Sequence, residues 1–219
     1  MAGTETLKRG DLRQALIDFA LSEAEAGHIE TISLRAASRA LGVSSGAVYR
    51  HFEDRDALLI EVAGIGFERL KHRFLEIRPE GDMAPTPEIA LSRCRRTTNA
   101  YIRFALENAA LWRMMFGRIG MLCQQKLMSD PEKMRYTPFD VLTENGADLH
   151  RLGVIAEMPS LADYRFIWSA THGAAQLVLE GVRQDSDRVS EVIDDTSRRA
   201  LKLLGVAPET LDALFGVQE

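Results

Sequence analysis

The sequence predicts an all-α protein. Apolar residues recur at helical spacing along most of the 219 residues, and neither a sustained strand-like alternation nor an internal repeat occurs. Glycines and prolines stand between the periodic segments, where they end or begin helices. We expect a head of three helices over residues 1–55, joined by a long fourth helix to a C-terminal helical bundle over residues 56–219.

The first two helices have clear ends. An apolar stripe from Leu12 to Ala20 at helical spacing marks the first helix, which ends near Gly27. Ser33 is a favourable N-cap for a second, short helix, and Gly42 stops it because glycine adopts a positive φ without steric cost. These two segments form the first half of the head.

The next two helices follow without a long connection. Ser44 can cap a third short helix that runs through His51, and Asp54 can cap a fourth that continues towards Arg78. Three of the seven prolines fall between Pro79 and Pro87, so the fourth helix must end there.

The second part of the chain shows five further periodic segments. A Met-rich connector closed by Pro131 follows the second of them, and Gly153 ends the third. The expected helices cover Ile89–Asn108, Ala110–Phe116, Tyr136–Leu152, Pro159–Val182 and Arg188–Leu204.

Residues 34–52 fit a helix-turn-helix. This motif needs a small residue where its helices touch, a turn residue that tolerates a positive φ, and an apolar residue that fixes the second helix. Counted from Leu34, the fifth, ninth and fifteenth positions are Ser38, Gly42 and Val48. The remaining apolar contacts come from Ala37, Leu41, Val43 and Phe52.

The exposed face of the second helix of this motif suits a DNA duplex. Gly46 lacks a side chain and lets the helix approach the groove, and Arg50 can donate two hydrogen bonds to a guanine edge. Tyr49 and His51 can donate to backbone oxygens. The residues left on this face are Ser45, Gly46, Tyr49, Arg50 and the adjacent His51.

Basic charge is local rather than general. The whole chain carries −5, which argues against a uniformly basic coat, whereas residues 33–55 hold four arginines against Glu53 and Asp54, a net +2. Arg35 is a second candidate base reader, and Arg55, in the first turn of the fourth helix, can contact phosphate. Each of these residues taken singly fits a core, capping or solvated role better than a DNA contact. Together they favour double-stranded DNA as partner.

The run from Ser33 to Phe52 closely resembles the DNA-binding signature of the TetR/AcrR family, and Glu53–Leu59 fits its continuation. Ala37 and Ser38 depart from the usual branched aliphatic followed by Ala, and Arg55 replaces the usual Lys. The resemblance implies phosphate contacts by Tyr49, His51 and Arg55, a position near the DNA backbone for Ser33 and Ser44, and base contacts by Arg35, Ser45 and Arg50.

Two C-terminal segments resemble one TetR subgroup. Trp168–Gly181 is similar to its Trp-His-Gly motif, and Ala110–Gly117 to another stretch of its regulatory domain. The helix that holds the motif is apolar nearly all round, so both of its sides require burial. We expect one side to pack in the protomer and the other against a second copy, with the final helix completing a four-helix homodimer interface.

The resemblance further implies a repressor, favoured over an activator, that binds a pseudo-palindromic operator and is controlled by a small hydrophobic effector. The expected cavity lies between the fourth helix and those that follow. Plain core packing is the alternative for most of its candidate residues. They are Phe67, Phe104, Trp112, Met115, Phe116, Met121 and Trp168, with His172 as a possible polar group.

Two other classes compete with a DNA-binding regulator. The five histidines form no HExxH pair, and neither a nucleophile elbow nor a glycine-rich phosphate loop occurs, so no enzyme, metal or cofactor is expected. Cys94 and Cys123 lack paired-cysteine spacing and are expected to be buried free thiols. The acidic net charge leaves open a ligand-binding or protein-interaction module without affinity for DNA.

A cytoplasmic location is expected as well. The longest uncharged apolar stretch, Ile167 to Leu179, is shorter than the roughly 20 residues that span a bilayer. The opening residues show no basic region followed by an apolar run, so no secretory signal and no membrane partner are predicted.

Overall fold

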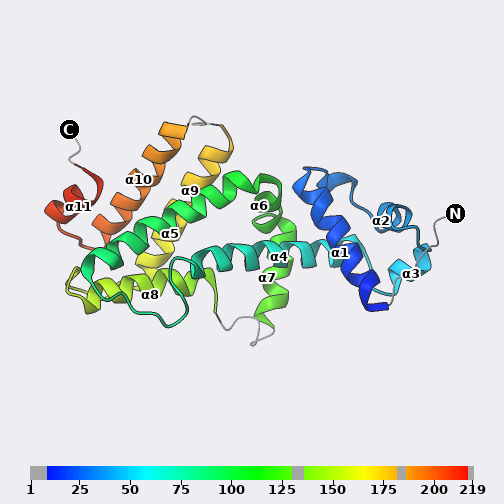
Figure 1. Ribbon diagram of the computed structural model, residues 1–219, viewed down its shortest axis with the longest axis horizontal. Coiled ribbons are helices and arrows are strands. Elements are labelled where there is room, and N and C mark those ends of the chain that lie inside the picture. The colour runs from blue at the N-terminus through cyan, green and yellow to red at the C-terminus, as the bar shows by residue number, and fades with distance from the viewer. Residues whose placement is uncertain (1–8, 130–135, 182–185, 217–219) are drawn as a thin grey trace. The chain divides into compact units, whose positions relative to one another are not determined.

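The computed structural model describes residues 9–129, 136–181 and 186–216, and within these ranges every regular element is helical (Figure 1). The all-α prediction is therefore confirmed. The chain forms two compact units. Met1–Glu68 with Asn108–Lys133 form the first, and Arg69–Glu107 with Met134–Glu219 form the second. The division at residue 55 by function stays a prediction.

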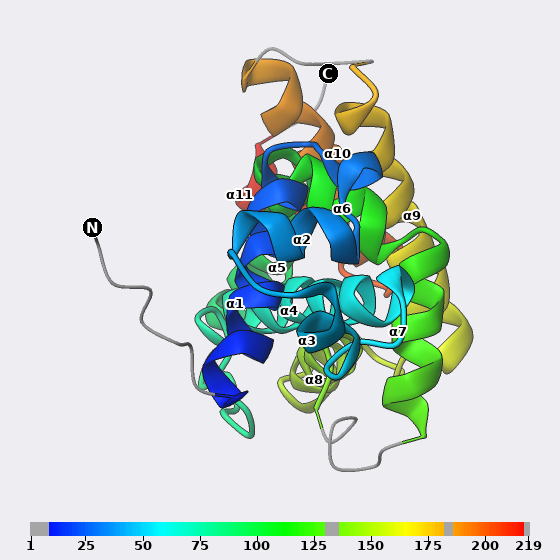
Figure 2. The same cartoon turned by 90° about the vertical axis from the view of Figure 1, so that its right-hand side faces the viewer.

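The first unit is built around α1. This helix packs against α2, α3 and α6, and the three N-terminal helices stand in blue and cyan in Figure 2. Around this helix the core is aliphatic, with Leu16, Ala20 and Val48 fully buried, and Trp112 and Met115 of α6 are fully buried as well. The elements of the unit are α1 (Arg9–Glu25), the 3-10 turn η1 (Ile29–Thr31), α2 (Leu34–Ala40), α3 (Ser45–Tyr49), the first part of α4 (Arg55–Leu75), α6 (Ala109–Met115) and α7 (Arg118–Met128).

Helix α7 lies where the sequence predicted a Met-rich connector. The prediction was wrong because Ile119, Gly120 and Cys123 form a buried face one turn long, a pattern that the polar and Met residues around it obscure. The joint between α6 and α7 is tight. A Cβ on Gly120 would lie 1.6 Å from the carbonyl oxygen of Met115, so only glycine fits there.

The second unit is built around α5. This helix packs against α8, α9 and α10, and α10 also packs against α9 and α11 (Figure 1). The elements are the end of α4, α5 (Pro87–Glu107), α8 (Pro138–Arg151), α9 (Leu161–Leu179), α10 (Ser186–Leu203) and α11 (Pro208–Phe215).

Helix ends in this unit follow local capping chemistry. Ser160 caps α9 by accepting from the backbone N–H of Asp163 at 3.3 Å, so the helix begins at Leu161, two residues after the predicted start at Pro159. Helix α11 was not predicted. The last expected helix ended at Leu204, but Pro208 occupies the first turn of a further helix, where a missing N–H has no consequence.

A buried ionic cluster joins the segment after α4 to α8. The Arg78 guanidinium donates to Glu144 Oε2 at 2.8 Å and to the carboxylate of Asp148, which also accepts from the Ala84 N–H at 3.0 Å and Arg151 Nη2 at 2.9 Å. Burial alone would raise the pKa of Asp148, but these donors outweigh it and lower the pKa below its ordinary value. The charges are therefore paired where they are buried.

Candidate DNA-binding surface and effector cavity

The turn between α2 and α3 is held by backbone and side-chain hydrogen bonds. Ser33 Oγ accepts from the Ala36 N–H at 3.0 Å, and Ser44 Oγ accepts from the Ala47 N–H at 3.2 Å, which confirms both predicted N-caps. Gly42 has φ +66°, and the next N–H, of Val43, donates to the Ser38 carbonyl at 3.0 Å. The helix-turn-helix geometry is therefore fixed by the residues that the sequence assigned to it.

Helix α3 buries one side and exposes the other. Val48 is fully buried and Phe52 nearly so, while Tyr49 is 51% exposed. Arg35, Ser44, Ser45, Gly46 and Arg50 are exposed, and Ser33 and His51 are half-buried. A Cβ on Gly46 would meet nothing within 4 Å, so the backbone there is open to a large partner. The side chains assigned to DNA are thus available at the surface, apart from Arg55.

Arg55 has a structural contact that the sequence did not suggest. Its Nε donates to the Ile32 carbonyl at 2.8 Å, and its Nη2 donates to the Ile29 carbonyl at 2.7 Å. These bonds connect the first residue of α4 to η1 and to the residue that follows it. Arginine reaches the two carbonyls from two separate nitrogens held in one rigid plane, whereas lysine would have to reach both from a single nitrogen, which gives a physical reason for arginine at this position.

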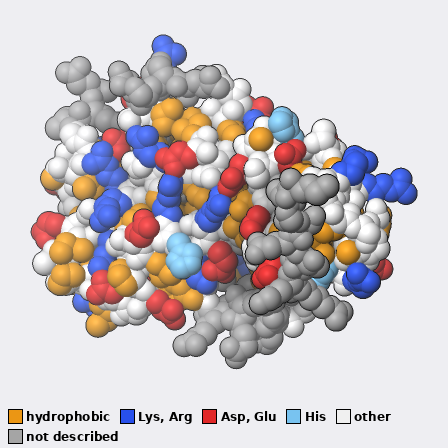
Figure 3. Space-filling model, turned by 45° about the vertical axis from the view of Figure 1, so that its right-hand side comes forward, with side chains coloured by type: hydrophobic (Ala, Val, Ile, Leu, Met, Phe, Trp, Pro, Cys, Tyr) orange, Lys and Arg blue, Asp and Glu red, His pale blue; other side chains and the backbone are white. Residues whose placement is uncertain are grey.

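The surface charge is mixed. Figure 3 shows basic side chains interspersed with acidic ones over the face that it draws, so no field of one sign covers that face. Some of the acidic groups near the motif are already paired. Glu61 bonds Arg13 and Lys126, and Asp56 bonds Arg118. In these ion pairs a basic side chain neutralises each carboxylate, which weakens the repulsion that it would exert on a polyanion.

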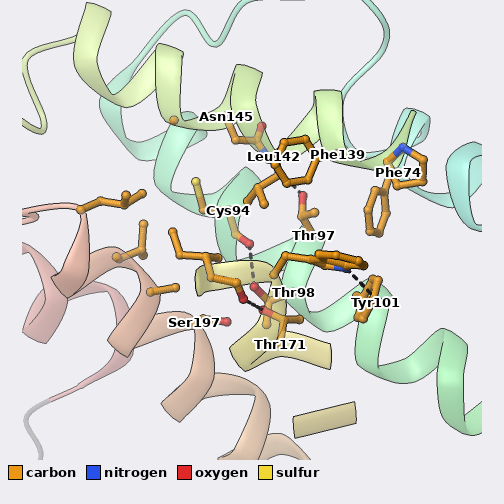
Figure 4. A pocket seen from close by; sticks show the side chains of 17 residues that line it. Phe74, Cys94, Thr97, Thr98, Tyr101, Phe139, Leu142, Asn145, Thr171 and Ser197 are labelled. Carbon is orange, nitrogen blue, oxygen red and sulfur yellow. Dashed lines mark hydrogen bonds between the residues drawn. The ribbon is translucent and has the colours of Figure 1, made fainter. Parts of the chain in front are cut away.

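A cavity of about 80 Å³ lies inside the second unit (Figure 4). Its aromatic wall comes from Phe74 at the end of α4, Tyr101 of α5, Phe139 of α8 and Trp168 of α9. The other lining residues are Cys94, Thr97, Thr98, Pro138, Leu142, Asn145, Gly146, Ile167, Thr171, Ser197, Ala200, Leu201 and Leu204. Five helices thus contribute to one mostly apolar chamber.

A chain of hydrogen bonds closes one side of the cavity. Trp168 Nε1 donates to the Tyr101 hydroxyl at 3.1 Å, and that hydroxyl lies 3.0 Å from His172 Nδ1. Burial lowers the pKa of His172, so the ring is neutral near pH 7 and Nδ1 can accept from tyrosine. Burial also raises the pKa of Tyr101, which keeps its hydroxyl protonated.

Of the eight residues predicted to bind ligand, the structure places only Trp168 in the cavity wall. His172 bonds to the lining residue Tyr101, and Phe104 is buried in the same unit beneath the Arg73 guanidinium. Four others form an aromatic and Met cluster in the first unit, and Met121 is 60% exposed. The clustered four are Phe67, Trp112, Met115 and Phe116.

The sequence did not single out the other lining residues, which include both apolar and polar side chains. Thr97, Thr98, Asn145, Thr171 and Ser197 are polar, and they converge only after four helices pack together. Polar residues at the buried positions of amphipathic helices were the feature of the sequence that could have indicated this cavity.

Helix α9 exposes an apolar stripe on the side away from the protomer core. Phe166 is 63% exposed and Leu177 is 58% exposed, and Ala170 and Gly173 lie between them at helical spacing. The opposite side, with Ile167 and Ala175, is buried. Such a stripe of small residues framed by larger ones permits close approach of another helix.

Neither a membrane span nor a metal cluster is found among the described residues. None of the described helices is long and apolar enough to cross a bilayer. No three His, Cys, Asp or Glu side chains in these ranges are grouped to hold a metal ion. Both cysteines, Cys94 and Cys123, are free thiols.

A helical head with an exposed second motif helix, followed by a helical unit with a cavity, defines a helix-turn-helix transcription regulator with a separate helical C-terminal domain. Residues 16–62 match the model of bacterial regulatory proteins of the TetR family. Residues 94–202 match the tetracycline-repressor-like C-terminal domain. The chain belongs to the TetR family.

Solved structures share the fold. A protein with unknown function from Rhodococcus sp. RHA1 is 25% identical, with 88% of this chain and 95% of that chain covered and a TM-score of 0.68. RolR in complex with resorcinol is 16% identical, with 96% and 95% covered and a TM-score of 0.60. The fatty acid degradation regulator FadR from Bacillus halodurans is 13% identical, with 89% and 96% covered and a TM-score of 0.62. No curated protein matches the sequence.

Proposed function

We propose that this TetR-family protein is a repressor that binds a pseudo-palindromic operator as a homodimer and is controlled by a small hydrophobic effector. The observation that carries the proposal is the helix-turn-helix with Tyr49 and Arg50 on its outer side. Such a protein acts where the chromosomal DNA lies, which places it in the cytoplasm.

The DNA contacts divide into base readers and backbone contacts. Arg50, Arg35 and Ser45 face base edges in this proposal, since arginine can bond guanine O6 and N7 together. Tyr49 and His51 donate to phosphate oxygens. Ser33 and Ser44 use an oxygen lone pair as caps, and each hydroxyl proton remains able to reach a phosphate. We now assign Arg55 chiefly to positioning α4, because two carbonyls hold it.

The homodimer forms through the exposed stripe of α9 together with α10. Two motifs related by a twofold axis can then enter successive major grooves about 34 Å apart. A monomer would contact only half of the site. The stripe supports the dimer because an exposed Phe166 and Leu177 separated by small residues are costly in water.

Effector control acts through α4. This helix begins at Arg55, in the unit that holds the DNA motif, and carries Phe74 in the cavity wall. An effector that binds better to one position of α4 shifts the population of DNA-binding dimers, with a coupling on the order of 1–3 kcal/mol. The structure of RolR with resorcinol shows a protein of this fold holding a small aromatic molecule.

Selection of bound DNA from a random pool, followed by gel shift, tests the proposal. We expect a sequence with twofold symmetry, and Arg50→Ala should relax base preference by a factor of roughly 10 at one position per half-site. Arg96→Ala, an exposed arginine of α5, is the matched control and should leave the preference unchanged. Enrichment of no sequence would instead favour a ligand-binding module without DNA affinity.

A further inference from the structure

The polar groups of the cavity offer acceptors and almost no donors. A hydroxyl has one proton, and in four lining side chains that proton is directed to a helix carbonyl four residues earlier. The distances are 2.8 Å from Thr97 to Arg93, 3.4 Å from Thr98 to Cys94, 2.9 Å from Thr171 to Ile167 and 2.7 Å from Ser197 to Ile193. What these hydroxyls turn towards the cavity is their lone pairs.

Asn145 adds an unused acceptor. Its side chain lines the cavity and is 2% exposed, and its Nδ2 donates to Thr97 Oγ1 at 3.2 Å. Its Oδ1 is buried and has no hydrogen-bond partner among the residues that the structure describes. A buried amide oxygen without a partner costs free energy, and that cost is removed when a donor arrives.

No charge is available to pair with an ionic ligand. The lining residues, all within the described part of the chain, include no Asp, Glu, Lys, Arg or His. Burial raises the pKa of the Cys94 thiol to about 12, so this lining group is neutral too. A carboxylate or an ammonium would lose its hydration here without compensation.

The volume of the cavity and its aromatic lining restrict the class of ligand further. A volume of about 80 Å³ admits a handful of waters or one compact organic molecule. Phe74, Tyr101 and Phe139 (Figure 4) present aromatic surface on which a planar ring can pack. Trp168 adds to this surface.

We propose that the effector is a compact, neutral, mostly apolar molecule with a hydroxyl that donates to Asn145 Oδ1, a phenol or a small alcohol rather than a carboxylic acid, an amine or an ether. This inference rests on the proposed effector site and specifies its chemistry. A site built around a buried acceptor discriminates strongly against analogues that lack the donor, because the acceptor is then left unpaired.

A matched panel of phenol, anisole, toluene and benzoate tests the inference on the full chain by calorimetry. Phenol donates a hydrogen bond, anisole only accepts, toluene does neither, and benzoate carries a charge. We expect phenol to bind roughly 10-fold more tightly than anisole or toluene, and benzoate not to bind. In Asn145→Leu, the preference for phenol over toluene should fall to about one, with toluene binding kept.

Thr196→Val is the control variant. Thr196 also bonds a carbonyl on α10, at 2.7 Å from Val192, but does not line the cavity, so the preference for phenol should persist. Equal or tighter binding of anisole or benzoate by the wild-type protein overturns the hydroxyl assignment, and so does failure of the whole panel to bind. Neither result bears on operator binding, which gel shift with the selected DNA measures separately. If Asn145→Leu fails to fold, the wild-type panel alone decides.

Discussion

Arg55 Nε donates a hydrogen bond to the carbonyl oxygen of Ile32 at 2.8 Å. The two residues are 23 positions apart, so the bond closes a long segment that contains the whole helix-turn-helix. A second bond to the Ile29 carbonyl makes the attachment two-pronged. This one side chain therefore ties the start of α4 to the residues that precede the motif, and its loss should lower the stability of the first unit.

Replacing Arg55 with alanine should lower the free energy of unfolding of the first unit by about 1–3 kcal/mol, because two partly buried carbonyls lose a charged donor. Arg55→Lys should recover only part of this, since lysine has a single nitrogen to reach two carbonyls that arginine reaches from Nε and Nη2. Urea unfolding followed by circular dichroism measures the effect. Arg39→Ala, at an exposed position of α2, should change stability by less than about 0.5 kcal/mol. Equal stability of all three variants would contradict a structural role for Arg55 and would leave phosphate contact as its function.

Gly120→Ala should destabilise the first unit by about 3 kcal/mol or more, because the added Cβ would overlap the Met115 carbonyl and force α6 and α7 apart. Gly64→Ala is the matched control in the same unit. Its Cβ would meet Cys123 Sγ at an ordinary 3.8 Å, and alanine is the better helix former, so this variant should be neutral or more stable. Thermal unfolding of both variants compares them directly, and similar melting temperatures would contradict the tight joint.

The ionic cluster around Asp148 should make the second unit sensitive to acid. A carboxylate whose pKa is lowered on folding contributes stability above its unfolded pKa of about 4, and loses that contribution as pH falls through the lower folded value. We expect the free energy of unfolding to fall between roughly pH 5 and pH 2, and Asp148→Asn to reduce this slope while lowering stability at neutral pH. Denaturant titrations at several pH values measure the slope. If the pH dependence of the free energy of unfolding is unchanged in Asp148→Asn, Asp148 is not the source of the acid sensitivity.

Phe166→Asp should convert the proposed dimer into a monomer, because a carboxylate buried in an apolar helix contact loses its hydration. Sedimentation velocity at micromolar protein gives the mass. Met83→Asp changes an equally exposed apolar residue, at 62% exposure, in the segment before α5, and should leave the mass unaltered. A dimer that persists in Phe166→Asp would show that α9 is not its interface.

The helix-turn-helix could be predicted from sequence because its determinants are local. Ser33, Gly42 and Ser44 act on neighbours within a few residues, and their effects need no knowledge of distant packing. Arg55 shows the limit of this reasoning. A basic residue beside a DNA motif suggests phosphate, and only the folded chain brings the carbonyls of Ile29 and Ile32 to it.

The cavity could not be predicted in the same way. Thr97, Asn145, Thr171 and Ser197 lie on four different helices and become neighbours only when α5, α8, α9 and α10 pack. Size and hydrophobicity pointed instead to Trp112 and Met115, which fill the core of the other unit. A buried core and a ligand cavity are lined by the same residue types. They differ in whether the side chains fill the space between the helices, and the sequence does not show this.

The protein holds two tryptophans, and each unit contains one: Trp112, fully buried in the first, and Trp168, in the cavity wall of the second. Their indole emission spectra should differ, since one ring is dry and the other partly hydrated and hydrogen-bonded to Tyr101. The chain thus carries its own optical probes, Trp168 for occupancy of the cavity and Trp112 for the state of the first unit.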